Sequence, residues 1–464
     1  MDYMKARLDS HLHIDLSNVG ALTMLKNLLT YPNPKFQDAE RMGFYTGNIL
    51  PTIPTWEFDP AKRELKIARG EASKTRRALQ AQGVDLAWAD NTIEGKELSS
   101  ITYENNEFQL DERQERAIFA TQQWQQGIIH AATSAGKSAI ILGAIARIKR
   151  KTLVIVHRKV LLEQLVDDAK KWLKNASIGI VGDGKRDVAD VTFCIDKSLI
   201  KAMQTHPELF ADVGLVIQDE CHLSPATTFQ YLIDKLPARR RFGLTGTLKR
   251  KDRMEFLIHA TFGNVIATIT KSELEEAGRT TPVEIQVHET ETAVPDYVFN
   301  LSPSECWREC DTAIHADPER KLRAVQIVGS ILNANPSARI LILSRYVEPC
   351  YEMERLLTQF NIKSGVVTGK EDDHKQTCDE LERGECSVVT ATIGTVATGV
   401  NIKSLTDVIL FSPVFSNELM LHQIRGRLMR RAEGKEKATF HLMFDPRIFD
   451  EKRIKQAVRI LRKS

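Results

Sequence analysis

Short apolar runs recur along most of this 464-residue chain and alternate with longer stretches in which apolar residues follow a helical spacing. In the middle of the chain the runs cover residues 128–129, 152–156, 191–194, 215–217 and 241–245. The pattern restarts after about residue 283, with runs at 339–343, 365–368, 386–390, 407–411 and 438–441. Strands that alternate with helices in this way are typical of a parallel sheet covered on both faces. We therefore predict two similar α/β domains in series.

The first part of the chain follows another pattern. Residues 11–16 alternate between apolar and polar, the segments 31–34 and 50–54 are rich in proline, and a basic helical stretch follows at about 70–82. This mixture predicts a small α+β accessory domain. Since one core rarely grows to the size that such a long chain would require, we expect three domains, at residues 1–105, 106–282 and 283–464.

Composition narrows the class of protein. Apolar residues make up 42% of the chain and charged residues 27%, no stretch has the apolar length of a membrane span, and the first residues lack the apolar core of a signal peptide. These features predict a cytoplasmic protein with no membrane partner. The seven cysteines lie at irregular spacing. The closest pair, Cys306 and Cys310, lacks a second Cys/His pair for zinc, so we interpret all cysteines as structural or incidental.

The charge is unevenly distributed. The net charge is only +3, but basic residues concentrate at 62–77 and from 447 to the C-terminus. Two interpretations remain open, contacts with an anionic partner such as nucleic acid or solvated faces of ordinary helices.

Residues 131–138, Ala-Ala-Thr-Ser-Ala-Gly-Lys-Ser, lie between an apolar run and a helix-like stretch. Phosphate groups bind where backbone N–H groups converge at the N-terminus of a helix. Gly136 lets the backbone approach a phosphate, Lys137 supplies a positive charge, and the Ser138 hydroxyl is a candidate Mg²⁺ ligand. Ala131 stands where the first glycine of such loops is usual. The other predicted nucleotide contacts in the loop are Thr133, Ser134 and Ala135.

Two adjacent acids, Asp219 and Glu220, follow the apolar run that ends at residue 218. With a phosphate loop upstream, Asp219 is placed to hold Mg²⁺ and Glu220 to polarise the attacking water, so nucleotide hydrolysis is the predicted reaction. The segment 243–247, Gly-Leu-Thr-Gly-Thr, ends the next apolar run, and its hydroxyls are candidates for coupling the metal site to its surroundings. Upstream of the loop, the Gln114 amide is able to read an adenine edge.

The order and spacing of these segments resemble the superfamily 2 helicases and translocases, with acids of the DExH type at 219–222. The resemblance covers about residues 106–445 and implies two RecA-like domains that bind ATP and nucleic acid. It also implies that His157, Arg158 and Ser198 contact the backbone of the nucleic acid, which permits movement regardless of sequence.

The second α/β domain carries further segments that the resemblance assigns. Residues 422–430, His-Gln-Ile-Arg-Gly-Arg-Leu-Met-Arg, are similar to the motif whose arginines stabilise charge on the γ-phosphate. This similarity implies catalytic roles for Gln423, Arg427 and Arg430. Residues 395–401 resemble a further motif, with Gly399 and Asn401 as cofactor contacts and Asn401 where an Asp is common. The implied nucleic-acid contacts in this domain are Ser344, Arg345, Thr368 and Thr390.

Within the superfamily, residues 133–138 and 398–401 look closest to the UvsW-like phage helicases and, more distantly, to XPB-like proteins. Residues 34–36 and 43–47 resemble the small DNA-binding domain that precedes the motor in UvsW-like proteins. The resemblance predicts an ATP- and Mg²⁺-dependent DNA helicase or translocase, phage-encoded in a bacterial host. It would unwind or branch-migrate forks, Holliday junctions and D-loops in recombination, repair or replication, with DNA contacts independent of sequence.

Other functions stay open. They are an RNA-dependent ATPase of the same superfamily, a nucleic-acid-binding module without catalysis, and the motor of a restriction complex. The intact Lys137 and Asp219–Glu220 disfavour the second. Trp56 and Trp88 are candidates for duplex contacts or for core packing, and residues 281–298 are a candidate hairpin. We expect a monomer, although nothing in the sequence sets the oligomeric state.

Overall fold

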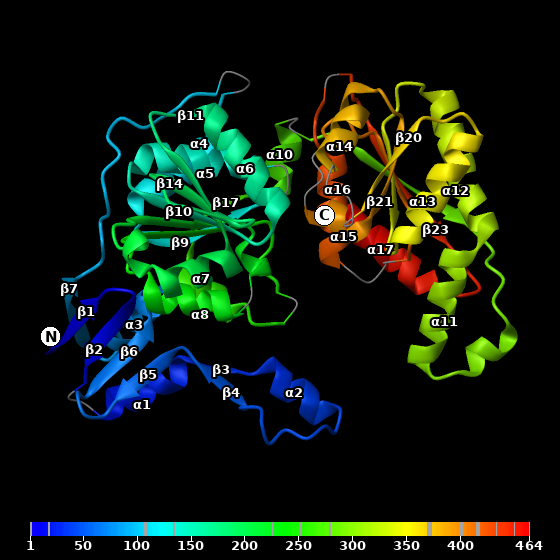
Figure 1. Ribbon diagram of the computed structural model, residues 1–464. Helices are drawn as coiled ribbons and strands as arrows, with labels where there is room; N and C mark the ends of the chain where they lie inside the picture. Colours follow the sequence, from blue (N-terminus) through cyan, green and yellow to red (C-terminus); the bar gives the residue numbers. More distant parts are fainter. Residues whose placement is uncertain are drawn as a thin grey trace. The chain divides into compact units, whose positions relative to one another are not determined.

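The structure, a computed structural model, describes residues 2–16, 19–105, 109–132, 135–224, 226–250, 252–277, 280–368, 374–398, 402–413, 418–432, 434–449 and 451–463. By its internal contacts the chain divides into two compact units, Met1–Thr270 and Lys271–Ser464 (Figure 1). The first unit contains a five-stranded and an eight-stranded sheet, and the second contains a six-stranded sheet. None of the described helices is long and apolar enough to cross a membrane.

The five-stranded sheet lies at the N-terminus and has the order β5-β6-β2-β1-β7. Its strands are β1 (Asp2–Leu8), β2 (His11–Asp15), β5 (Trp56–Asp59), β6 (Glu64–Ala68) and β7 (Val84–Asp90). Alternate residues of β2 and β6, such as Leu12 and Ile67, are fully buried against α1 (Val19–Leu28) and α3 (Ala72–Gln80). The mixed strand directions and the two helices confirm the predicted α+β accessory domain.

An arm leaves this small domain between α1 and β5 (Figure 1). It consists of β3 (Thr30–Pro32), α2 (Pro34–Arg41) and β4 (Thr52–Pro54), with β3 and β4 paired antiparallel. The ring of Tyr31 stacks on Phe256 with centroids 4.4 Å apart, and Arg253 Nη2 lies 2.5 Å from Asp38 Oδ2. The arm is therefore anchored on the α/β part of the first unit.

The eight-stranded sheet has the order β13-β12-β14-β10-β15-β16-β9-β17, and every pair is parallel except β12 with β13. Its strands are β9 (Gln126–Ala131), β10 (Thr152–Val156), β12 (Ile178–Gly182), β13 (Lys185–Asp187), β14 (Val191–Ile195), β15 (Leu215–Gln218), β16 (Arg240–Thr245) and β17 (Val265–Ile269). Five of these strands confirm the apolar runs predicted as strands. The pattern missed the other three, because glycines interrupt β12 and because β13 and β17 have exposed positions at or near the sheet edges.

Helices cover both faces of this sheet. In Figure 1, α4 (Glu112–Gln123), α5 (Lys137–Ile148) and α6 (Lys159–Trp172) lie on one face, and α7 (Asp196–Thr205) and α8 (Ala226–Lys235) lie on the other. The short helix α9 (Phe256–Phe262) packs on β9 and β16, and a separate pair joins β8 (Thr102–Tyr103) to β11 (Leu173–Lys174). This arrangement confirms the first predicted α/β layer structure.

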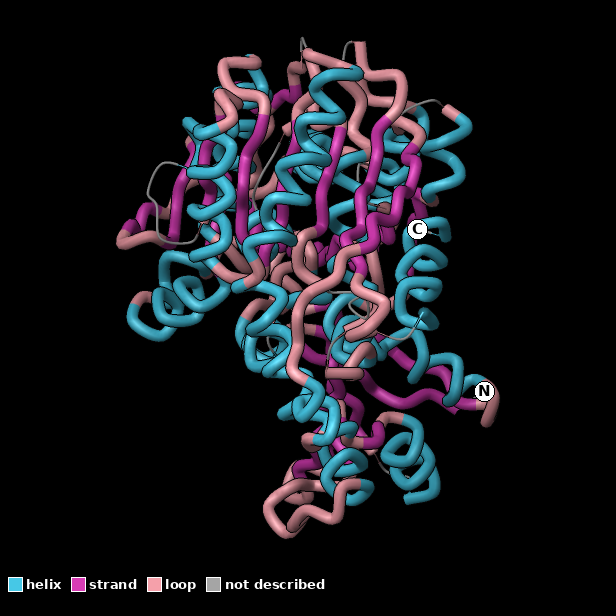
Figure 2. The backbone as a smooth tube through the Cα atoms, turned by 90° about the vertical axis from the view of Figure 1, so that its right-hand side faces the viewer, coloured by secondary structure: helices cyan, strands magenta, loops and turns pink. Residues whose placement is uncertain are grey.

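The second unit is built on a fully parallel sheet of order β18-β23-β22-β19-β21-β20. Its strands are β18 (Val283–Glu289), β19 (Ile340–Ser344), β20 (Ser364–Val367), β21 (Val388–Thr392), β22 (Asp407–Leu410) and β23 (Ala438–Phe444). Alternate residues of β19 enter two cores: Ile340 and Ile342 pack beneath one set of helices, and Leu341 and Leu343 pack beneath another. Figure 2 shows these strands flanked by helices. The second predicted α/β domain is confirmed.

The helices of this unit divide between the two cores. The first core includes residues of α12 (Pro318–Ala334) and α13 (Val347–Gln359). The second includes residues of α14 (His374–Arg383), α15 (Ile393–Thr398), α16 (Glu418–Leu428) and α17 (Glu451–Lys463). The unit also contains α10 (Lys271–Glu276) and α11 (Pro303–Ala316).

The hairpin considered for residues 281–298 is wrong. Residues 283–289 form β18, which pairs in parallel with β23 along its whole length, and Asp296–Asn300 is a short 3₁₀ helix. An edge strand with alternating exposure has the local pattern of a hairpin arm. Its partner, Ala438–Phe444, is far away in the sequence, so local pattern alone cannot identify the pairing.

Arg69 joins the N-terminal sheet to the eight-stranded sheet. Its side chain is only 1% exposed and donates hydrogen bonds to Gln126 Oε1, Ala238 O and Arg239 O, each at 2.8 Å. The neighbouring Gly70 packs so closely that an added Cβ would lie 2.1 Å from the carbonyl oxygen of His259. The accessory domain is thus fixed to the α/β part by buried polar contacts.

We predict that Arg69→Met destabilises the first unit by on the order of 3 kcal/mol, because two buried carbonyls lose their donor. Thermal unfolding and limited proteolysis measure this effect, and faster release of the accessory domain is expected. Arg76→Met, which removes an exposed arginine paired with Asp85, is the control and should cost less than about 1 kcal/mol. Equal behaviour of the two variants would contradict the prediction.

Candidate active site

Three neighbouring strands of the eight-stranded sheet, in the order β15-β16-β9, end at the same edge because they run parallel. The segment after β9 leads to Lys137, the segment after β15 carries Asp219 and Glu220, and β16 ends at Thr245. Ligand sites in parallel sheets form at the carboxyl ends of the strands. The topology thus gathers the predicted phosphate loop and the acids on one edge.

The phosphate loop turns into α5 at Gly136. This residue is the N-cap of the helix and has a φ of +75°, in the left-handed region that glycine adopts without strain. Lys137 and Ser138 are the first two residues of α5, where backbone N–H groups lack partners within the helix. The predicted contacts Thr133 and Ser134 lie outside the described residues.

Gln114 holds the phosphate loop from the side. It is buried at the start of α4, where its Oε1 accepts a hydrogen bond from Asp111 N at 3.0 Å and its Nε2 donates to Ala135 O at 3.0 Å. Both ends of the amide are therefore bonded to the chain. Adenine reading by Gln114 stays a prediction, and it would require these bonds to be exchanged.

Lys137 and Glu220 form an ion pair, with Nζ 2.8 Å from Oε1. Burial raises the pKa of Asp219, and the charge of Glu220 adds to this effect. Burial would also raise the pKa of Glu220, but the charges of Lys137 and His222, together with hydrogen bonds from Lys137 and the Gly246 backbone, outweigh it and lower that pKa. Glu220 is therefore the carboxylate that carries the charge, and Lys137 is the counterion that a phosphate group would compete for.

The backbone at Glu220 is unusual, because its φ of +43° is positive although it is not glycine. Such conformations cost free energy and persist where the surrounding structure imposes them, often at functional sites. Asp219 Oδ1 accepts the N–H of Glu220 at 2.9 Å, which holds the turn. A hydroxyl from Ser138 and a carboxylate from Asp219 are hard oxygen donors of the kind that Mg²⁺ prefers, so the residues present fit this ion.

His222 links the acids to the end of β16. Its Nδ1 lies 2.7 Å from Thr245 Oγ1 and 3.4 Å from Glu220 Oε2. Thr245 Oγ1 also accepts the N–H of Thr247 at 3.2 Å. The segment 243–247 is thus bonded to the acidic turn, as its hydroxyls suggested.

Arg250 supports the same turn, and sequence reasoning missed it. Its guanidinium is buried and donates to the carbonyls of His222 and Ser224 at 3.1 and 2.9 Å, while Asp252 lies 2.7 Å away as counterion. Arg250 lies five residues after Thr245 and belongs to none of the motifs identified in the sequence. Only the folded chain brings the arginine beneath the acids.

The predicted nucleic-acid contacts of the first unit differ in accessibility. Arg158 is exposed at the N-cap of α6, and Ser198 is half-buried in the first turn of α7. Both ring nitrogens of His157 are buried without a hydrogen-bond partner among the described residues, and burial lowers its pKa to about 4. Arg158 is therefore better placed to meet a phosphate than His157, and all three roles stay predictions.

In the second unit, the hydroxyl residues predicted as phosphate contacts are buried. Ser344, Thr368 and Thr390 are 0% exposed, and the hydroxyl of Thr390, in the middle of β21, donates to Cys350 O at 2.9 Å. Burial counts against direct contact of these three side chains with a phosphate. Arg345 remains accessible at the end of β19, where Asp311 Oδ2 lies 3.0 Å from its Nη1.

The arginine-rich segment of the second unit forms α16 and the turn after it. Gln423 and Arg427 are half-buried and lie one helical turn apart, while Arg430 follows the helix end. Lys435, which sequence reasoning missed, donates to the carbonyls of Leu428 and Arg430 at 2.7 and 2.8 Å and so fixes this turn. Gly399 and Asn401 lie outside the described residues.

Arg425, which lies in α16, is another residue that sequence reasoning missed. It is 7% exposed, and its Nε and Nη1 have no hydrogen-bond partner among the described residues. Burial lowers its pKa to about 10. Gln423 and Arg427 match the spacing of the helicase motif at residues 422–430, whereas Arg425 occupies no assigned position in that motif.

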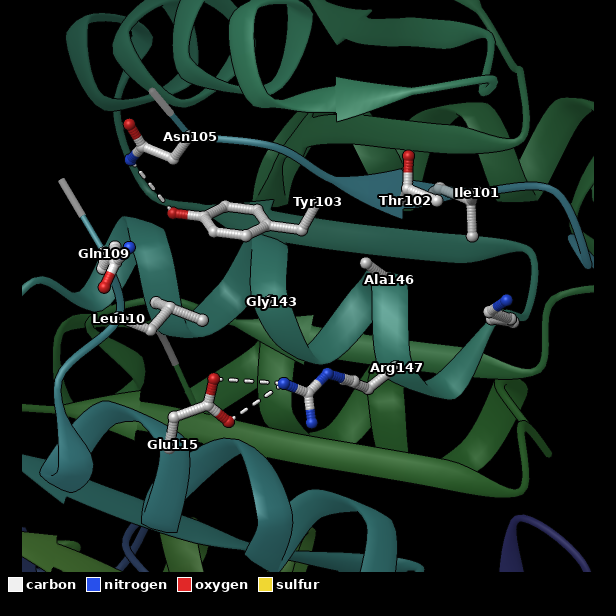
Figure 3. A pocket seen from close by; sticks show the side chains of 11 residues that line it. Ile101, Thr102, Tyr103, Asn105, Gln109, Leu110, Glu115, Gly143, Ala146 and Arg147 are labelled. Carbon is white, nitrogen blue, oxygen red and sulfur yellow. Dashed lines mark hydrogen bonds and ion pairs between the residues drawn. The ribbon is translucent and has the colours of Figure 1, made fainter. Parts of the chain in front are cut away.

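A cavity of about 550 Å³ lies beside α5 in the first unit (Figure 3). Glu115 and Arg147, paired at 3.0 Å, form one wall, and Tyr103 with Asn105 forms another. Gly143 of α5 also lines the cavity. Neither Lys137 nor the acids line this cavity, so it is separate from the candidate active site.

Two family models match the chain. The model described as "Type III restriction enzyme, res subunit" matches residues 105–250, and that described as "Helicase conserved C-terminal domain" matches residues 323–432. The first matched region contains the phosphate loop and the acids, and the second contains Gln423, Arg427 and Arg430.

Curated relatives align over most of the chain. It is 26% identical over 363 residues to "Probable helicase D10" of Escherichia phage T5, which covers 77% of this chain and 75% of that protein. It is 27% identical over 364 residues to "DNA 3'-5' helicase XPB" of Mycobacterium tuberculosis, covering 75% and 64%. It is 25% identical over 350 residues to "ATP-dependent DNA helicase uvsW" of Enterobacteria phage T4, covering 72% and 68%. The crystal structure of T4 UvsW aligns with a TM-score of 0.47 and 21% identity, covering 100% of this chain and 97% of that one.

We predict that Gly136→Ala weakens nucleotide binding at least tenfold. The left-handed conformation costs about 1–2 kcal/mol for a residue with a Cβ, and that Cβ would lie 2.3 Å from Gln114 Nε2. Titration with a fluorescent ATP analogue measures the effect. Gly329→Ala in α12, where a Cβ meets nothing within 4 Å, should bind nucleotide like the unmodified chain.

A second substitution tests the link between the acids and β16. Thr245→Val removes the hydroxyl beside His222 while keeping the side-chain shape, and we expect ATP turnover to fall about tenfold, in line with one lost buried hydrogen bond. Nucleotide affinity should change less than about twofold. Thr245→Ser keeps the hydroxyl and is the control. Normal turnover by the valine variant would show that the link has no role in hydrolysis.

Proposed function

Because this chain belongs to the superfamily 2 helicases, we propose that it is an ATP- and Mg²⁺-dependent translocase that remodels branched DNA. Helicase activity driven by ATP is common to the family. The branched substrate, the metal and the individual residue roles are our proposal. The observation that carries it is the pairing of Lys137 with Glu220 at 2.8 Å, next to Asp219 and on the edge where β9, β15 and β16 end.

The residues of the first unit would act as follows. When the phosphates of ATP bind, Lys137 exchanges Glu220 for them, which frees that carboxylate to orient and deprotonate the attacking water. Ser138 and Asp219 would hold Mg²⁺, which would supply positive charge beside the phosphates when bound. His222 and Thr245 hold Glu220 in place, and Arg250 supports the turn.

In the second unit, we assign Gln423, Arg427 and Arg430 to the same reaction, as contributors of charge and hydrogen bonds to the γ-phosphate. Gln423 and Arg427 share one face of α16. The turn that carries Arg430 is held by Lys435. Lys435 contacts the backbone carbonyl of Arg430 and not its guanidinium.

DNA is preferred over RNA because two of the relatives aligned over most of this chain are named DNA helicases. Support for a branched substrate comes from the accessory domain and its arm, which Arg69, Tyr31 and Arg253 hold on the α/β part. The arm ends in a loop with exposed side chains; Phe44 is 66% and Tyr45 82% exposed. Exposed aromatic rings can stack on the unpaired bases of a fork.

The other residues of the accessory domain that the sequence suggested as DNA contacts are less exposed than Phe44 and Tyr45 or are paired within the chain. Trp56 is partly buried in the domain core, and its Nε1 donates to Thr30 Oγ1 at 2.9 Å, whereas Trp88 is 39% exposed. Most basic residues at 62–77 contact partners within the chain. Examples are Lys62 with Asp59, Lys66 with Glu57 and Arg76 with Asp85. Apart from the buried Arg69, we therefore favour for this run the interpretation of ordinary solvated residues.

A panel of nucleic acids tests the proposal. We expect forks, Holliday junctions and D-loops to stimulate ATP turnover more than homoduplex DNA or RNA hybrids, because only branched DNA offers both a duplex track and a junction at which strands separate. Stimulation by RNA alone would favour the RNA-dependent ATPase. A double substitution, Phe44→Ala with Tyr45→Ala, should remove the preference for forks and leave turnover on single-stranded DNA unchanged.

We predict that Glu220→Gln lowers ATP turnover by about 10²–10⁴-fold, the usual contribution of a general base. Nucleotide affinity should be retained, because Lys137 no longer has a charged competitor. Glu208→Gln, at an exposed position of the same unit, is the control. Unchanged turnover of the Glu220 variant would show that another residue activates the water.

A further inference from the structure

Imidazole and carboxylate side chains gather where the accessory sheet meets the α/β part of the first unit. One ligand atom each from Asp9, His11 and His13 lies within 4.8 Å of the others. We propose that these three residues bind a divalent transition-metal ion of the Zn²⁺ class. The site shares no residue with the proposed ATP site and adds to the proposed function a metal that does not take part in hydrolysis.

The local backbone brings the three residues together. Asp9 lies in the turn between β1 and β2, where its N–H donates to His11 O and its Oδ1 accepts the N–H of His11, both at 2.9 Å. Residues two apart in a strand point to the same face. Because Leu12 is buried in the accessory core, His11 and His13 both point to the opposite face, beside Asp9.

The separations suit a metal. Asp9 Oδ1 lies 3.0 Å from His13 Nε2, close to the separation of about 3.3 Å between ligand atoms around tetrahedral zinc with bonds of about 2.0–2.1 Å. Arg7 lies on the other carboxylate oxygen of Asp9, at 3.5 Å from Oδ2. Two imidazole nitrogens and one carboxylate oxygen form a donor set that Zn²⁺ and its neighbours bind well.

Further carboxylates orient both imidazoles. His13 Nδ1 lies 2.9 Å from Glu64 Oε1, and His11 Nε2 lies 3.1 Å from Asp234 Oδ1. Metal-binding histidines usually donate their second ring N–H to such a carboxylate, which fixes the nitrogen that faces the metal. The nitrogens that would face the ion are His13 Nε2, which hydrogen-bonds Asp9 Oδ1 at 3.0 Å and would exchange that contact for the metal, and His11 Nδ1, which lies 3.1 Å from Ser10 Oγ. His11 is only 5% exposed, so little water competes there.

The proposed metal site lies at the boundary between the accessory sheet and the α/β part of the first unit. Asp9, His11 and His13 belong to the accessory sheet, whereas Asp234 belongs to α8 of the α/β part. An ion that orders His11 also orders its contact with Asp234. Metal binding would therefore brace the accessory domain against the α/β part, beside the contacts of Arg69.

Binding of Co²⁺ and Zn²⁺ to the full chain tests the inference. We expect one equivalent of metal by elemental analysis after dialysis, and a visible Co²⁺ spectrum without the near-ultraviolet band that cysteine thiolates produce. The double variant His11→Ala with His13→Ala should bind at least tenfold more weakly. His206→Ala is the matched control, because this exposed histidine also contacts a carboxylate, Glu208, at 3.2 Å, but belongs to no such cluster among the residues that the structure describes.

A second variant and a second measurement separate metal loss from misfolding. Asp9→Asn keeps the size of the side chain and should also lose the Co²⁺ spectrum. Zn²⁺ should slow proteolytic release of the accessory domain in the unmodified chain and in His206→Ala, but not in Asp9→Asn. No uptake by the unmodified chain, or an unchanged spectrum in the double variant, would overturn the proposal. ATP turnover with Mg²⁺ reports independently on the hydrolysis site.

Discussion

The parallel direction of the strands is the constraint on which the candidate site depends. Because β9, β15 and β16 run the same way and lie next to one another, whatever follows each strand must emerge at one edge of the sheet. Lys137, the acids and Thr245 come from segments far apart in the sequence and meet there. A strand running the other way would place its following residues at the opposite edge, and the ion pair of Lys137 with Glu220 could not form.

Buried polar contacts then give this edge its shape. Gln114 bonds the phosphate loop, and Arg250 bonds the carbonyls of the acidic turn. Isolated charges are costly to bury, and the buried guanidinium of Arg250 accordingly has two carbonyl acceptors and the carboxylate of Asp252 beside it. The positive φ of Glu220 is tolerated for the same reason, since the bonds of Asp219 and His222 hold the turn in place. Hydrogen bonds thus fix positions that apolar packing alone would leave free.

The fold was predictable where burial was complete. Strands such as β10 and β19 are buried at every position and read as continuous apolar runs. At the edges of the sheets the pattern is weaker: β17 mixes exposed and buried residues and β18 mixes exposed and half-buried ones, so the segment of β18 has the local pattern of a hairpin arm. Burial also limits which predicted nucleic-acid contacts are accessible. Thr390 has the chemistry of a phosphate contact, but its place in the middle of β21 buries it against Cys350.

The sequence by itself determined the α/β class and predicted the phosphate loop and the acidic pair, because each depends on residues close together in the chain. The phosphate loop is recognisable locally, because Gly136 caps a helix and the next two residues, Lys137 and Ser138, begin it. Only the tertiary structure decided that Arg250 supports the acids, that Arg69 fixes the accessory domain, and that His11 lies beside Asp234. These contacts join segments distant in the sequence. Long-range pairing is set by the packing of whole sheets and helices, which no local spacing records.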